Sequence, residues 1–118
     1  MKKDKNKLVR EFVKFNIQVL DLRNIPKMVL TTDRNKTQTY AHADLNKNEI
    51  VIYTKNRSLG DIFRSISHEL IHLAQNEKGT IDTIPNPGST GSPIENEANA
   101  GAGIMMRHFG KLHPEIFE

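Results

Sequence analysis

Residues 58–79, SLGDIFRSISHELIHLAQNEKG, are the stretch of sequence that most constrains the fold. Ser58 and Asp61 have the Ser-x-x-acid spacing of a helix start, and Gly79 is typical of the residue that follows a helix end. Between these signals the apolar residues recur every three or four positions, which predicts one buried helix face. This apolar face consists of Leu59, Ile62, Phe63, Ile66, Leu70, Leu73 and Ala74.

A pair of histidines lies on the opposite side of this predicted helix. His68 and His72 are four residues apart, so their imidazoles share a face about 6 Å apart along the axis and can bind one metal ion. Glu69 follows the first histidine, where a carboxylate can hold and deprotonate a water at the metal. The alternative is two unrelated surface histidines, but the helical context and the acids downstream favour a metal site.

A catalytic zinc site usually has three protein ligands, so a third ligand is needed. Residues 75–78 contain no further histidine, and the candidates are Glu95 and Glu97 in the next predicted helix. Ser92-Pro93-Ile94-Glu95 also has the spacing of a capping box, which would give Glu95 a capping role only and leave Glu97 to bind the metal. Helix phase favours Glu95, because it lies at the edge of the apolar face of its helix.

The segment over residues 58–99 resembles the gluzincin family of zinc metallopeptidases. It combines the HELIH motif at 68–72, a segment rich in glycine and proline, and the sequence ENEAN at 95–99. The chain length and the order of the predicted elements are similar to those of the small stand-alone members called minigluzincins. The resemblance implies a minimal zincin-like domain that binds Zn²⁺.

The resemblance also implies a role for each motif residue. His68, His72 and Glu95 would bind the zinc ion. Glu69 would be the catalytic base, and Asn99 would support His68 from the glutamate helix. Many members have Asp where this chain has Asn99, and an amide adds no negative charge to the histidine that it supports.

The rest of the chain predicts an α+β domain over residues 1–118. Together with the resemblance, the pattern implies an N-terminal helix, a three-stranded, mainly antiparallel sheet, an active-site helix and a glutamate helix. The predicted elements are a helix over 7–22, a strand over 28–32, a hairpin of 37–45 and 49–55, the helix over 58–79, a loop over 79–93, a helix over 92–110 and a tail over 111–118.

Composition and charge exclude several classes of protein. The chain has 118 residues, 36% of them hydrophobic, and a net charge of +3 with much of its basic excess near the N-terminus. The absence of cysteine excludes disulfides, thiolate metal sites and thiol nucleophiles. No apolar run approaches the roughly 18 residues of a membrane span and no secretory signal is recognisable, so we expect a cytoplasmic protein. The basic residues lack interleaved aromatic residues, so we expect no nucleic-acid partner.

The predicted function is a zinc-dependent endopeptidase that acts on a peptide or protein substrate. Glu69 would take a proton from the zinc-activated water and pass it to the leaving amine. The resemblance implies a substrate that lies along an edge strand, either 37–45 or 49–55. The alternatives are a non-catalytic zinc-stabilised binding or regulatory module and a basic nucleic-acid adapter.

Two further parts of the prediction concern the C-terminal tail and a second oxyanion donor. The C-terminal tail carries ligand-type residues, His113, Glu115 and Glu118, and could fold back onto the open zinc position to make a latent enzyme. Inhibitory C-terminal segments of some minigluzincins motivate this hypothesis. A second oxyanion donor is usual in the family, and no candidate has a diagnostic spacing. These candidates are Tyr40, His42, Tyr53, Arg107, His108 and His113.

Overall fold

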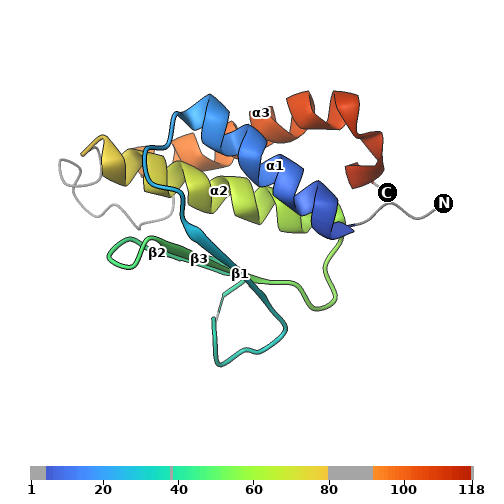
Figure 1. Ribbon diagram of the computed structural model, residues 1–118, viewed down its shortest axis with the longest axis horizontal. Helices are drawn as coiled ribbons and strands as arrows, with labels where there is room; N and C mark the ends of the chain where they lie inside the picture. Colours follow the sequence, from blue (N-terminus) through green and yellow to red (C-terminus); the bar gives the residue numbers. More distant parts are fainter. Residues whose placement is uncertain (1–4, 38, 80–91, 118) are drawn as a thin grey trace.

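Three helices lie over one face of a three-stranded sheet (Figure 1). This computed structural model describes residues 5–37, 39–79 and 92–117, without the side chain of Glu115. None of the helices in these segments has the length and apolar character needed to span a bilayer. In chain order the elements are α1 (Lys5–Leu20), β1 (Lys27–Thr31), β2 (Ala41–Asp44), β3 (Glu49–Tyr53), α2 (Leu59–Glu77), α3 (Pro93–Leu112) and the 3-10 helix η2 (Pro114–Phe117).

The sheet is mixed, whereas the sequence predicted a mainly antiparallel one. Its strand order is β1-β3-β2, with β3 parallel to β1 and antiparallel to β2. β3 takes the centre because Ile50–Tyr53 are all buried, whereas every residue of β1 and β2 is at least partly exposed. The expectation that 49–55 could be an edge strand is therefore wrong, and β2 is the edge strand that remains from that prediction.

β2 is shorter than the strand predicted over 37–45. The side chains at the start of that stretch make local hydrogen bonds. Thr37 Oγ1 lies 2.9 Å from His42 Nδ1, and Thr39 Oγ1 donates to the carbonyl of Ala41 at 2.8 Å. Such local side-chain bonds compete with a strand ladder. Residues 41–44 pair with β3, and the carbonyl of Tyr40 accepts one further hydrogen bond from the N–H of Tyr53.

The core is an aromatic cluster to which each helix contributes a ring. Phe12 of α1 stacks on Phe63 of α2 with ring centroids 4.5 Å apart, and its edge contacts Phe109 of α3 at 5.1 Å. Ile50 and Ile52 of β3 are fully buried in the same cluster. The periodic apolar face predicted for residues 59–74 therefore packs on α1, α3 and the sheet.

The chain beyond Gly110 is structured, whereas the sequence predicted a helix end and a tail. α3 continues to Leu112, and η2 follows with Ile116 fully buried. Phe117 packs directly on Gly110, and the carbonyl oxygen of Ile116 lies 2.9 Å from the position that a Cβ on Gly60 would take. Glycine at these two positions therefore allows the chain end to pack against α2 and α3.

This packing places η2 at the N-terminal end of α2, away from the histidines. Gly60 precedes His68 by eight residues, which is about 12 Å along a helix axis. His113 Nε2 lies 3.6 Å from Glu11 Oε2 of α1 and not beside the histidine pair. The described part of the tail thus contradicts a fold-back of His113 onto a metal site, whereas Glu118 and the side chain of Glu115 lie outside the described structure. The predicted loop over 79–93 also falls almost wholly outside it.

Candidate metal centre

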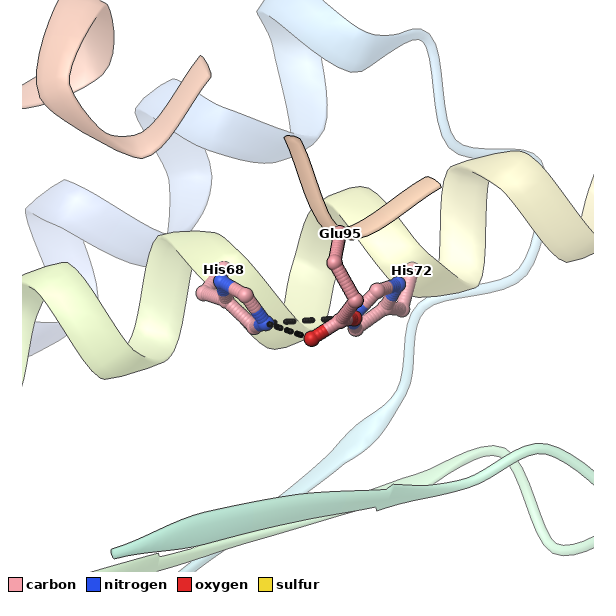
Figure 2. A group of neighbouring side chains, drawn as sticks. All are labelled: His68, His72 and Glu95. Carbon is pink, nitrogen blue, oxygen red and sulfur yellow. Dashed lines mark hydrogen bonds and ion pairs between the residues drawn. The ribbon is translucent and has the colours of Figure 1, made fainter. Parts of the chain in front are cut away.

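His68, His72 and Glu95 converge between α2 and the first turn of α3 (Figure 2). Ser58 caps α2 by accepting a hydrogen bond from the backbone N–H of Asp61, and the helix then presents both imidazoles on one side. Ser92 caps α3 in the same way by accepting from the N–H of Glu95, whose carboxylate reaches the histidines. The capping geometry and a role beside the histidines are therefore compatible at Glu95.

The three side chains bring ligand-type atoms to one point. The Nε2 atoms of His68 and His72 are 3.0 Å apart, and the Glu95 carboxylate oxygens lie 3.6 Å from the first and 2.6 Å from the second. Ligands bound at 2.0–2.1 Å to a tetrahedral zinc ion are about 3.3 Å from one another. Two imidazoles and one carboxylate also form a donor set found in catalytic zinc sites. The group therefore fits a divalent zinc ion by both spacing and chemistry.

Gln75 orients His72 and is a site residue that the sequence analysis did not single out. It is 3% exposed, and its Nε2 donates to the carbonyl of Ile94 at 3.1 Å and to Glu97 Oε1 at 2.8 Å. Its Oε1, 2.8 Å from His72 Nδ1, is therefore the acceptor of the imidazole proton. This tautomer leaves the lone pair of His72 on Nε2, the atom that faces Glu95. The signal in the sequence is the spacing of three residues from His72, which puts both side chains on one helix face.

Glu97 contacts Gln75 and not the histidines. Its carboxylate accepts the Gln75 amide, whereas Glu95 contacts both histidines. The structure therefore places Glu95 and not Glu97 at the histidine pair. Glu97 takes part by holding the amide that orients His72.

His68 is held from α3 by Asn99. Burial and the neighbouring imidazole of His72 lower the pKa of His68, while Glu95 and a hydrogen bond with the Asn99 side chain partly offset this by raising it. The net effect keeps His68 neutral near pH 7, and the neutral imidazole is the form that binds a metal. The structure thus puts Asn99 at the imidazole that the resemblance assigned to it.

Glu69 is partly buried next to the group. Burial raises the pKa of Glu69 to about 7, with a further increase from the Glu95 carboxylate and an opposing decrease from His72. A carboxyl group with a pKa near neutrality exchanges a proton readily at physiological pH, which is the property required of a general acid–base residue. Glu69 directly follows the ligand-type residue His68 on α2.

No described contact joins the candidates for a second oxyanion donor to His68, His72 or Glu95. His42 pairs with Thr37, and His113 stacks on Phe109 and faces Glu11. The remaining four lie outside the group as well: Tyr40 and Tyr53 face the guanidinium groups of Arg57 and Arg34, and Arg107 and His108 line grooves along the helices. Only His68, His72 and Glu95 form a cluster of ligand-type side chains within the described residues.

No protein-family model, no curated protein and no solved structure matches this chain in comparisons with known proteins. The functional argument therefore rests on the geometry of the site itself.

Proposed function

We propose that the protein is a zinc-dependent endopeptidase of the gluzincin type. The convergence of two imidazole Nε2 atoms and one carboxylate at ligand spacing is the observation that carries this proposal. His68, His72 and Glu95 would hold the ion. When bound, zinc supplies a Lewis acid that lowers the pKa of a water and polarises a scissile carbonyl.

Glu69 supplies the proton transfer in this proposal. Its carboxylate accepts the proton of the attacking water and then gives it to the nitrogen of the leaving amine. The pKa near 7 suits both transfers, because neither protonation state is strongly favoured at neutral pH. Partial burial limits competing contact between this carboxylate and bulk water.

Two amide side chains orient the imidazole rings of the histidines. Gln75 fixes the proton on Nδ1 of His72, and Asn99 hydrogen-bonds His68. Such partners of metal-binding histidines fix the tautomer and the ring orientation, and their loss typically costs metal affinity or activity. Both amides thus act as positioning residues.

The substrate is a peptide or protein in an extended conformation. β2 is an edge strand of the sheet, so its outer backbone groups can pair with a substrate strand. Backbone pairing selects side chains only weakly. The proposal includes the cytoplasmic location predicted from the sequence.

Metal analysis and a digest test this proposal together. Purified protein should contain about one zinc per chain and should cleave casein, and a chelator should abolish the cleavage. Glu69→Gln should keep the zinc and lose cleavage by a factor on the order of 10² or more. Zinc retention with cleavage that does not depend on Glu69 would overturn the mechanism, and bound zinc without any cleavage would support the binding-module alternative.

A further inference from the structure

Contacts between residues of α2 and α3 begin at the metal centre and continue along the seam between the two helices. The two helices run antiparallel, so residues at intervals of four along each helix meet at successive levels. Beyond the Glu95–His72 contact, Asn99 meets His68, and Gly103 meets Arg64 one level further. The paired residues, in order from the metal centre, are Glu95 with His72, Asn99 with His68, and Gly103 with Arg64.

A positively charged groove lies at the far end of this seam. It has a volume of about 370 Å³, and three cations line it: Arg64, Arg107 and Lys111. Two glycines of α3 and the apolar side chains of Met106 and Phe117 form the rest of the wall that the structure describes, and none of these described lining residues is acidic. The Arg64 guanidinium lies beside Gly103, 4.0 Å from the position that a Cβ would take there, which is an ordinary van der Waals distance.

The three cations have no partner in the described part of the chain. Arg64, Arg107 and Lys111 are exposed and take part in no ion pair or side-chain hydrogen bond among these residues. Arg57, by contrast, binds the Asp61 carboxylate at 2.8 Å. Three neighbouring cations, with no acidic side chain among the described lining residues, create a local field that favours an anionic ligand.

We propose that this groove, named here the cationic groove, binds an acidic segment of the peptide substrate that also carries an apolar side chain. This inference rests on the proposed endopeptidase function and names the substrate class. Arg64 precedes His68 by one turn, about 6 Å, or about two residues of extended peptide. Arg107 follows Glu95 by twelve residues, about 18 Å along α3, or about five residues of extended peptide. Acidic residues two to five positions from the scissile bond would therefore meet these cations.

The apolar part of the groove favours a peptide over a polynucleotide. Phe117 packs on Gly110 and is still 63% exposed, so a substrate side chain can cover its apolar surface beside the cations. A single-stranded polynucleotide would stack successive bases on several aromatic side chains, and Phe117 is the only aromatic among the described lining residues. Polynucleotide binding is accordingly an outcome of the test.

Fluorescence anisotropy tests the cationic groove without requiring cleavage. The probes are a fluorescein-labelled decapeptide with four Glu and one Phe, its counterpart with Gln in place of Glu, and labelled dT20. Zinc-loaded Glu69→Gln protein is titrated into each labelled probe. The acidic peptide should bind at least fivefold tighter than the Gln peptide and tighter than dT20.

Charge-removing variants, made in the same Glu69→Gln protein, then locate the binding. Adding Arg107→Gln and Lys111→Gln together should weaken the acidic peptide about threefold to tenfold, in line with exposed charge pairs, and adding Arg64→Gln should weaken it further. Lys14→Gln removes an exposed cation of α1 and should change the affinity less than twofold. A groove variant that matches Lys14→Gln, or dT20 that binds as tightly as the acidic peptide, would overturn the proposal.

Cleavage assays on proteins with Glu69 intact separate this inference from the proposed function. Cleavage of both peptides with equal kcat/KM would overturn the cationic groove and leave the endopeptidase proposal standing. Charge-dependent binding without any cleavage would support the groove as a peptide site and overturn the endopeptidase proposal.

Discussion

The two ends of the α2–α3 pair differ in chemistry although the same two helices form both. At one end Glu95 and Gln75 contact imidazoles, and the side chains meet through polar atoms that are partly open to solvent. At the other end Phe63 packs on Phe109, and Ile116 of η2 closes the core. Apolar burial stabilises the fold, whereas a cluster of titratable groups gains little unless a ligand neutralises it. The comparison indicates that apolar packing at the far end holds the helices together, whereas the polar end contributes little to stability without a ligand.

The apolar end should give the largest change in stability. Phe109→Ala should lower the free energy of unfolding by about 3–5 kcal/mol, because it removes a ring at the centre of the aromatic cluster and leaves a cavity. Urea denaturation of metal-free protein measures this. His72→Ala under the same conditions should cost less than 1 kcal/mol. If His72→Ala destabilised the metal-free protein as much as Phe109→Ala, the division between the two ends would be wrong.

Zinc should stabilise the protein through the polar end alone. At free zinc one hundred times Kd, the wild type should gain about 2.7 kcal/mol, and Glu95→Gln should lose most of this gain. Thermal unfolding with and without zinc measures the difference. Glu97→Gln is the matched control, because an amide oxygen at that position can still accept the Gln75 amide. A zinc effect lost in Glu97→Gln and kept in Glu95→Gln would reverse the assignment of the ligand.

Gln75 is buried although it lies at the polar end, so its substitution tests whether an orienting contact there affects zinc affinity. Gln75→Leu should lower zinc affinity about tenfold to a hundredfold, since His72 loses the acceptor that fixes its tautomer. Competition with a chelating dye measures the affinity. Gln18→Leu, an exposed change on α1, should leave it unchanged. Equal affinities in the two variants would show that His72 needs no orienting partner.

The smallest expected effect is the pH dependence of the metal-free protein. Folding raises the pKa of Glu69 from 4.5 to about 7, so the folded state holds this proton more tightly than the unfolded state. The contribution of this proton to the free energy of unfolding is complete below pH 4.5 and is lost as the pH rises through 7. Glu69→Gln lacks this loss, so its stability relative to the wild type should increase by on the order of 1 kcal/mol between pH 5 and pH 8, after discount for partial exposure. A difference that stays constant across this range would contradict the raised pKa.

Much of the candidate site could be predicted from the sequence. His68 and His72 share a face because helix geometry fixes the direction of residues four apart, and capping signals at Ser58 and Ser92 fixed where both helices begin. Helix phase also favoured Glu95 over Glu97, which agrees with their positions in the structure. Gln75 follows His72 by three residues on the same helix, but it was not singled out, because the contacts that orient its amide, with Ile94 and Glu97, come from another helix.

Local sequence signals are sufficient for the helix starts of this protein, its apolar helix faces and the pair of imidazoles on one helix face. These follow from backbone geometry within a few residues. The tertiary structure decided what depends on contacts distant in the chain, namely the parallel pairing of β1 with β3, the burial of Ile116 and the cationic groove. Side chains from separate helices approach only when packing sets the distance between those helices, and no local pattern encodes that distance.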